Sequence, residues 1–323
     1  MTRHRNEIDR EKQTTMLLYH SQDFEGHNTG AHPECVERIT RVNEMLKANG
    51  WLDKCSRPEW KLATSDQCQR IHTEGYLSKL QQWCEENAGR IEVDTVVSNR
   101  SWNAALMGAG AACDAVERVI RGEDSRAFCA IRPPGHHAIP DNAMGFCLLN
   151  NVAIAARHAK SLGLERVMIV DWDIHHGNGT QDAFWDDPTV AFVSIHRFPF
   201  YPGTGKEEET GGGAAQGTKK NIPIPASTTA KDFLAKLMDA TDVLASQFKP
   251  QLMLLSAGFD AHRADPVGGL SLEETDFETA TNWIVELAST HCEGRLVSLL
   301  EGGYNLTHMP LSVDAHLRGL SAS

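Results

Sequence analysis

The sequence predicts an α/β fold built around a mostly parallel sheet. Short apolar runs rich in β-branched residues recur along the chain, and stretches with helical periodicity lie between them. These runs are continuous rather than alternating, as expected of strands that are buried on both faces. Polar residues follow five of the runs directly, and open α/β sheets bind ligands at the carboxyl ends of their strands.

Six runs are the clearest strand candidates: MLLYH (16–20), AFCAI (127–131), VMIVDWD (167–173), VAFVSIH (190–196), LMLLSAG (252–258) and RLVSLLEGG (295–303). Helical patterns cover residues 148–161, 230–248 and 272–290, so strands and helices alternate as in a parallel sheet. The glycine- and charge-rich segment 203–220 predicts a surface loop. Because no linker, repeat or shift in composition divides the chain, we predict one domain over residues 1–323.

The composition is that of an ordinary globular protein. The chain has 323 residues, of which 41% are hydrophobic, enough for a substantial core. It contains no apolar run of 18 residues, and its first 15 residues lack the apolar stretch of a signal peptide. Eight cysteines without CxxC spacing predict free thiols. These features together predict a cytoplasmic protein without a membrane partner.

The net charge bears on the class of partner. The chain has 31 basic and 43 acidic residues, a formal charge of −12, whereas nucleic-acid binders present a basic surface to phosphates. An acidic surface favours cationic partners such as lysine-rich peptides or polyamines, although solubility alone also explains such a charge. We therefore expect no nucleic-acid partner.

The stretch DWDIHHGNG (171–179) holds two carboxylates and two imidazoles. If the preceding strand stays extended, its period of two places Asp171, Asp173 and His175 on one side. Asp260, at the end of the strand at 252–258, is the best-placed additional carboxylate. Two aspartates and one histidine suit zinc and leave a fourth position for water, as in catalytic zinc sites. The alternative is a solvated turn with a fortuitous cluster.

Two other motifs end predicted strands. His136 and His137 follow a rigid Pro-Pro-Gly, and such a pair suits either a second metal or general acid–base catalysis. Asp171 and Asn178 are candidate hydrogen-bond partners for the two imidazoles. Tyr304 follows two glycines that let the chain swing its side chain over the sheet edge, where the hydroxyl could donate to an oxyanion. A packed tyrosine in a glycine turn is the structural alternative.

Taken in order, these motifs resemble the zinc-dependent histone deacetylases of the arginase/deacetylase superfamily. The resemblance covers nearly the whole chain, through YHSQDFEGHNTGAHPECVERI, RPPGHHA, GFCLLNN, DWDIHHGNGTQ, SIHRFPFYPGTG, SAGFDAHRADPVGG and LEGGYN. The sequences of these motifs are closer to those of the class II and bacterial deacetylase-like amidohydrolases than to those of class I. The resemblance implies a single catalytic domain with three αβα layers around an eight-stranded, mostly parallel sheet.

The resemblance also implies roles for individual residues. It assigns zinc ligation to Asp173, His175 and Asp260. His137 is expected to be the general base and later the acid, His136 to act electrostatically, and Tyr304 to polarise the acyl carbonyl. Asp171 is expected to pair with His136 and Asn178 with His137, where class I proteins have an aspartate in place of the asparagine.

Substrate and ion contacts follow from the same resemblance. An acyl-lysine tunnel is expected to be lined by Gly145, Phe146, Phe200, Tyr201 and Val267. Asp94 is expected to accept hydrogen bonds from the substrate backbone, and Arg38 to lie near an internal acetate channel. Structural potassium is expected at Asp171, Asp173, His175 and Ser194. Iron(II) is an alternative to zinc as the catalytic ion in the cell.

The predicted function is zinc-dependent removal of acetyl or other short acyl groups from Nε-acyl-lysine by attack of a metal-activated water. An acetylpolyamine amidohydrolase is the alternative, which the net charge favours and the short segment 84–100 opposes. An acyl-lysine reader that lacks catalysis and a two-manganese arginase-like hydrolase are further readings of the same fold. The expected partners are an acyl-lysine peptide or protein, or an acetylated small amine, and the sequence leaves a homo-oligomer open.

Overall fold

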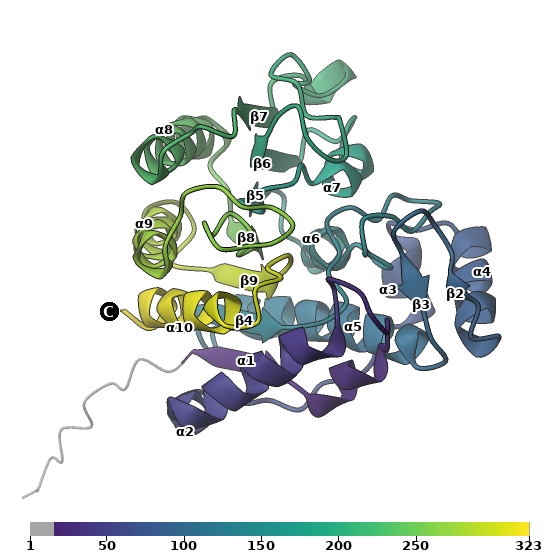
Figure 1. The fold of residues 1–323 in the computed structure, drawn as a ribbon. Coiled ribbons are helices and arrows are strands. Elements are labelled where there is room, and N and C mark those ends of the chain that lie inside the picture. Colours follow the sequence, from purple (N-terminus) through teal and green to yellow (C-terminus); the bar gives the residue numbers. More distant parts are fainter. Residues whose placement is uncertain (1–15, 323) are drawn as a thin grey trace, which may run out of the picture.

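The computed structural model describes residues 16–322, and a parallel sheet of seven strands forms the centre of this part of the chain (Figure 1). In spatial order the strands are β1 (Leu17–His20), β4 (Arg126–Ala130), β9 (Leu296–Leu300), β8 (Leu252–Ala257), β5 (Val167–Asp171), β6 (Val190–Arg197) and β7 (Lys219–Ile224). Every pairing between neighbours is parallel. The α/β class is therefore confirmed, and the last strand in the sequence lies between β4 and β8.

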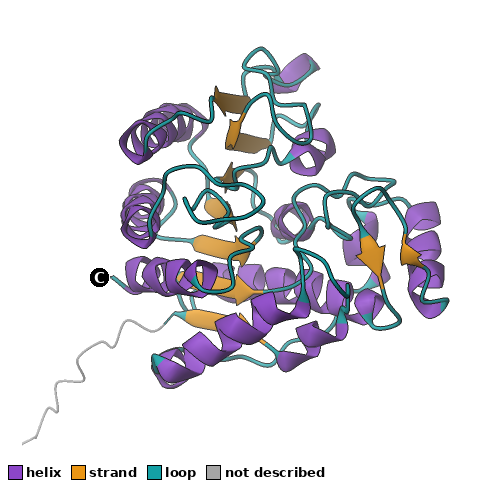
Figure 2. Cartoon of the chain, in the orientation of Figure 1, coloured by secondary structure: helices purple, strands orange, loops and turns teal. Residues whose placement is uncertain are grey.

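Helices cover both faces of this sheet (Figures 1 and 2). One layer consists of α1 (Val36–Ala48), α8 (Ala230–Phe248), α9 (Glu274–His291) and α10 (His308–Ser321). The other has α5 (Ser101–Ile120) and α6 (Asn151–Ser161) against the sheet, with α3 (Ser65–Gln69), α4 (Glu74–Glu85) and α7 (Asn178–Ala183) beside them. Burial on both faces explains why every residue of β5, β8 and β9 is buried and why these strands lack alternation.

Short elements complete the described chain. They are the helix α2 (Trp51–Lys54), the 3-10 helices η1 (Gln22–Gly26) and η2 (Gly213–Ala215), and a two-stranded antiparallel hairpin of β2 (Gly89–Arg90) and β3 (Val96–Val97). The hairpin lies apart from the main sheet, beside α4 (Figure 1).

The expected eighth strand is the first correction. Beyond β1, only Ser56 pairs in parallel: Leu18 N–H donates to its carbonyl (2.8 Å), and Ser56 N–H donates to the carbonyl of Met16 (3.1 Å). The next bond of this ladder requires an N–H at position 58, and Pro58 has none. The eighth strand is thus reduced to a single bridge in residues 16–322.

All six predicted strands form, but two of them end two or more residues earlier than expected. β5 ends at Asp171 because Asp173 N–H turns back to donate to Asp171 Oδ1 (3.1 Å), and β9 ends at Leu300. The three predicted helices correspond to α6, α8 and α9. Helix α6 begins at Asn151 rather than at 148, because the Asn150 side chain caps it by accepting the N–H of Ala153.

Strand β7 was not predicted, because its sequence, KKNIPI, begins with two lysines and contains a proline. Its first two residues, Lys219 and Lys220, are the last two of the segment 203–220 that we expected to be a loop. Lys219 is buried there, and its ammonium donates to the carbonyls of Val190 (2.8 Å) and Asp187 (3.1 Å). These bonds offset the cost of burying a charge.

The core and the thiols agree with the sequence-based expectations. One continuous cluster of buried apolar residues extends through the described chain, and all eight cysteines are free thiols. No helix within residues 16–322 is both long and apolar enough to cross a membrane. The interpretation of residues 1–15 as lacking a signal peptide falls outside the described residues.

Candidate active site

Loops from separate strands converge at the carboxyl edge of the sheet. The loops after β4, β5, β8 and β9 carry the histidine pair, Asp173 with His175, Asp260, and Tyr304, respectively. Because all these strands are parallel, their carboxyl ends lie at one edge, and residues far apart in sequence meet there.

Asp173, His175 and Asp260 form a compact buried group. Their potential ligand atoms all lie within 4.8 Å of one another. His175 Nδ1 lies 2.9 Å from Asp260 Oδ2 and 3.1 Å from Asp173 Oδ1. The predicted residues therefore meet, although a turn after Asp171 brings them together rather than a continued strand.

The chemistry of this group fits a divalent cation. Burial raises the pKa of Asp260, and the neighbouring Asp173 carboxylate raises it further. Burial disfavours the imidazolium of His175, but Asp260 and Asp173 outweigh that effect and raise its pKa to about 10. Two buried carboxylates thus require a positive charge between them. A metal held by two aspartate oxygens and one imidazole nitrogen supplies it.

Glycine keeps the space around this group free. A Cβ atom at Gly302 would lie 2.4 Å from Asp260 Oδ2 and 2.5 Å from Asp173 Oδ2. A Cβ atom at Gly258 would lie 2.2 Å from Asp173 Oδ2. Both contacts are closer than side chains tolerate, so the carboxylates can take these positions only because glycine is present.

The two histidines of RPPGHH lie side by side, with ring centroids 4.0 Å apart, but differ in their partners. His136 Nδ1 lies 2.9 Å from Asp171 Oδ2, and His137 Nδ1 lies 2.7 Å from Asn178 Oδ1. Both predicted pairings are therefore present.

These partners separate the two pKa values. Burial opposes the charged form of His136, but Asp171 and Asp173 outweigh it and raise its pKa well above the usual value. Burial lowers the pKa of His137 well below the usual value, and His136 and His175 lower it further. One imidazole is thus suited to a fixed positive charge and the other to accepting a proton.

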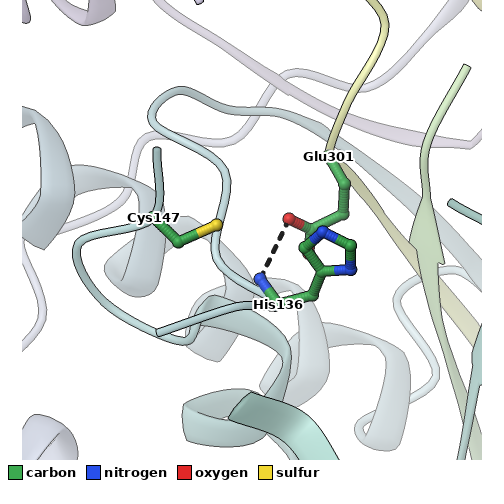
Figure 3. A group of neighbouring side chains, drawn as sticks. All are labelled: His136, Cys147 and Glu301. Atoms are coloured by element: carbon green, nitrogen blue, oxygen red, sulfur yellow. Dashed lines mark hydrogen bonds between the residues drawn. The ribbon is translucent and has the colours of Figure 1, made fainter. Parts of the chain in front are cut away.

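Glu301 is a residue of this site that the sequence analysis did not identify. Its Oε2 accepts the main-chain N–H groups of Gly135 (2.6 Å) and His136 (3.2 Å), and its Oε1 accepts the hydroxyl of Ser256 (3.1 Å). Figure 3 shows the bond from His136 N–H to Glu301. Glu301 therefore anchors the loop that presents both histidines. A carboxylate directly after the buried strand β9 was the available signal.

Cys147 lies beside Glu301 and His136, and the three form a second group with ligand-like spacing (Figure 3). Burial raises the pKa of the Cys147 thiol well above its usual value. The Cys147 thiol also donates a hydrogen bond to the carbonyl of Gly145 (3.3 Å). These properties fit a packed thiol better than a metal ligand, which must be a thiolate.

The loop that carries Tyr304 is fixed from two sides. Asp265 Oδ2 accepts the N–H groups of Tyr304 (2.6 Å) and Asn305 (3.2 Å). Arg38 donates to the carbonyls of Gly303 (2.5 Å) and Glu301 (2.6 Å), and its guanidinium lies 4.9 Å from the centroid of the Tyr304 ring. Asp265 was also missed, because its partners are main-chain groups that have no signature in the sequence.

A cavity of about 150 Å³ opens onto these groups. It is lined by Asp94, His137, Gly145, Phe146, His175, Phe200, Tyr201, Val267 and Tyr304. All six predicted substrate residues are in this set. The Phe200 ring stacks on His175 at a centroid distance of 5.1 Å, and Phe146 meets Tyr304 edge-on at 5.6 Å. The cavity therefore suits a slender apolar chain that ends in a polar group.

Asp94 belongs to the turn between β2 and β3 and supports the cavity wall. Its Oδ1 accepts the N–H of Gly145 (3.1 Å), while Thr95 Oγ1 accepts that of Phe146 (3.1 Å). These bonds fix two adjacent residues in left-handed backbone conformations, with φ of 56° at Gly145 and 69° at Phe146.

Ser194 lies in β6 directly opposite Asp171 of β5. Its hydroxyl lies 2.9 Å from His196 Nδ1. Of the residues expected to hold potassium, Asp171 and Ser194 are therefore neighbours across two paired strands.

A parallel α/β sheet with paired histidines beside a potential metal-ligand group at its carboxyl edge is compatible with a hydrolase. Comparison with known proteins gives the particular group: the sequence profile described as "Histone deacetylase domain" matches residues 32–320. The chain belongs to the histone deacetylase family, as its motifs predicted.

Curated relatives and a solved structure agree. The chain is 36% identical over 315 residues to a "Probable deacetylase" of Archaeoglobus fulgidus, which covers 96% of this chain and 88% of the relative. It is 37% identical over 322 residues to "Histone deacetylase 14, chloroplastic" of Arabidopsis thaliana, covering 94% of this chain and 76% of that protein. The crystal structure of the HDA15 HD domain superposes with a TM-score of 0.90 at 32% identity, covering 95% of this chain and 90% of that one.

Proposed function

We propose that the protein is a metal-dependent deacylase that removes acetyl or other short acyl groups from Nε-acyl-lysine. The observation that carries the proposal is the cavity, because one narrow apolar space joins His137 and Tyr304 to the metal-ligand residue His175. An acyl-lysine side chain is slender and apolar along its length and ends in an amide. Its shape and polarity thus match that space.

Asp173, His175 and Asp260 would hold the ion, with zinc as the expected metal and iron(II) as the alternative. When bound there, the metal supplies Lewis acidity toward water and toward the acyl carbonyl. Potassium is proposed behind this group, at Asp171, Asp173, His175 and Ser194. It would add positive charge beneath the carboxylates.

The chain's own residues carry out the proton transfers. The unprotonated Nε2 of His137 takes a proton from the attacking water while a new C–O bond forms at the acyl carbon. The Tyr304 hydroxyl donates a hydrogen bond to the carbonyl oxygen as negative charge develops on it. When the C–N bond breaks, His137 returns the proton to the lysine nitrogen, and the amine and carboxylic acid are released. His136, held protonated by Asp171, contributes fixed positive charge.

Acetylpolyamine hydrolysis is the second candidate, because the formal charge of −12 suits a cationic substrate. The segment 84–100 opposes it, since it folds as the compact β2–β3 hairpin and contains no long insertion. The physiological substrate is proposed to be a protein or peptide, met in the cytoplasm. No nucleic acid or membrane is needed for the reaction.

Purified protein of measured metal content should be assayed on one lysine peptide that carries acetyl, propionyl, butyryl or longer acyl groups. Acetylputrescine is assayed in parallel. We expect hydrolysis of the short acyl peptides and a lower kcat/KM for acetylputrescine. The opposite ranking would favour the polyamine enzyme. A folded, metal-loaded protein that binds acyl-lysine but hydrolyses none of these compounds would be a reader, and the proposal would be wrong.

A further inference from the structure

A third group of potential metal ligands lies outside the catalytic cavity. His262 belongs to the loop after β8, Glu274 is the first residue of α9, and His308 is the first residue of α10. One ligand atom from each lies within 4.8 Å of the others. None of the three lines the cavity described above.

The three side chains are directed toward one another. His308 Nδ1 lies 2.8 Å from Glu274 Oε1, and His262 Nε2 lies 3.6 Å from the same oxygen. The two imidazole rings stack at a centroid distance of 4.5 Å and an interplanar angle of 21°. Glu273 Oε2, at 3.8 Å from His262 Nε2, is a further carboxylate within reach.

His262 provides the independent evidence for a ligand. The residue is 1% exposed, and its Nε2 is one of five buried side-chain nitrogen or oxygen atoms in the described chain without a hydrogen-bond partner. Its other nitrogen, Nδ1, accepts the N–H of Ala264 (3.1 Å). Buried polar atoms nearly always have a partner, so an orphan nitrogen that points at two carboxylates requires an explanation.

We propose that His262, Glu274 and His308 form a second binding site for a divalent metal of the zinc type. Two imidazoles and a carboxylate are a common zinc ligand set, and Glu273 or water would complete four-coordination. Binding through His262 Nε2 places the imidazole proton on Nδ1, so the contact with Ala264 N–H is given up in exchange for the metal bond. The side chains of Glu274 and His308 are 24% and 35% exposed, which gives the ion a path from solvent.

Such an ion would connect the two loops that complete the catalytic site. His262 follows Asp260 by two residues, and His308 follows Tyr304 by four. Asp265, in the same loop as His262, already accepts the N–H of Tyr304. A metal at this position would therefore cross-link the Asp260 loop to the base of α10 and stabilise the placement of Tyr304.

The test compares the wild type with His308→Ala and Glu274→Gln after equilibrium dialysis against Zn²⁺. We expect the wild type to hold one more zinc ion per chain than either variant, and added Zn²⁺ to raise the Tm of the wild type more than that of either variant. His291→Ala, at the other end of α9, is the matched control and should behave like the wild type. Circular dichroism establishes that each variant is folded.

A further variant separates this site from the catalytic group. Asp173→Asn should lose the ion of the catalytic group and keep the zinc that depends on His308, whether or not the protein deacylates anything. Equal zinc content in the wild type, His308→Ala and Glu274→Gln would overturn the proposal. So would a second ion that is lost in His136→Ala but kept in His308→Ala, because that pattern indicates a two-metal catalytic centre.

Discussion

The imidazole of His137 is paired with an amide: its Nδ1 lies 2.7 Å from Asn178 Oδ1. A second hydrogen bond orients this amide, because Asn178 Nδ2 donates to Met144 Sδ (3.3 Å). An amide oxygen can only accept, so Nδ1 carries the proton and Nε2 is left with a free lone pair. Asn178 thus fixes the tautomer of the proposed base without adding negative charge.

Asn178→Asp should change the pH dependence of the reaction. A carboxylate at this distance stabilises the imidazolium and raises the pKa of His137. A base with a higher pKa is protonated at a higher pH, so the acid limb of the kcat/KM profile should move to higher pH. Asn178→Ala should lower activity without this shift. An acid limb that is the same in the wild type and Asn178→Asp would contradict the assignment of His137.

Tyr304→Phe should lower kcat/KM by about 10²–10³, the usual effect of losing one oxyanion donor. Metal content and Tm should stay close to those of the wild type, because the loop is held by Asp265 and Arg38 through main-chain groups. Tyr19→Phe is the control, since the Tyr19 hydroxyl donates to Asp114 (2.7 Å) away from the cavity and should affect stability alone. Full activity in Tyr304→Phe would exclude the tyrosine from the reaction.

Gly302→Ala should weaken metal binding by at least about tenfold, the scale of changes next to first ligands. The added methyl group would lie 2.4 Å from Asp260 Oδ2 and 2.5 Å from Asp173 Oδ2, so the carboxylates must move. Gly75→Ala is the matched control, because a Cβ atom there would meet no neighbouring atom within 4 Å. The measurement is a competition titration against a chelator with a chromophore. Unchanged affinity would mean that the ion is held elsewhere.

Glu34→Gln should destabilise the fold. Glu34 is buried and accepts hydrogen bonds from Arg132 Nε (2.7 Å) and Arg38 Nη1 (2.8 Å). Removing one partner of a buried ion pair typically costs about 3–5 kcal/mol at neutral pH. Urea unfolding of the variant at pH 7 measures this loss. Glu44→Gln, which removes a surface pair with Arg41, should have little effect.

The same carboxylate makes stability depend on pH in a defined window. Burial favours the neutral form of Glu34, but Arg132, His27 and Arg38 outweigh it and lower the pKa from 4.5 to about 2. The unfolded state therefore binds more protons than the folded state between these values, so this contribution is present above pH 4.5 and is lost as the pH falls toward 2. Glu34→Gln should have a flatter stability curve in this window. Equal slopes for both proteins would contradict the pairing.

Much of the site could be predicted because its residues follow recognisable strands. Asp173 and His175 lie within four residues of the end of β5, and Asp260 lies within three of the end of β8; parallel strands deliver such residues to one edge. Glu301 and Asp265 escaped prediction because they act on main-chain N–H groups, whose positions exist only in the folded chain. Patterns of side-chain type carry no information about those bonds.

The two wrong predictions about the fold have similarly local causes. Strand β7 carries lysines because Lys219 finds carbonyl acceptors inside the protein, and hydropathy cannot anticipate such compensation. The missing eighth strand depends on a single residue, Pro58, that lacks the donor which the next bond of the ladder needs. Both differences lie at edges of the sheet, where fewer contacts constrain the sequence.

The position of β9 has a consequence for biosynthesis. Its neighbours β4 and β8 belong to two half-sheets, β1–β4 and β8–β5–β6–β7, that touch within the sheet only through this late strand. A nascent chain that has not yet released residues 296–300 from the ribosome can pair neither half with the other. Arg38 must likewise wait for the carbonyl of Gly303, 265 residues later. Such distant pairings slow folding, so the pocket should mature after translation of β9, and the exposed edges of β4 and β8 are where a chaperone would be needed.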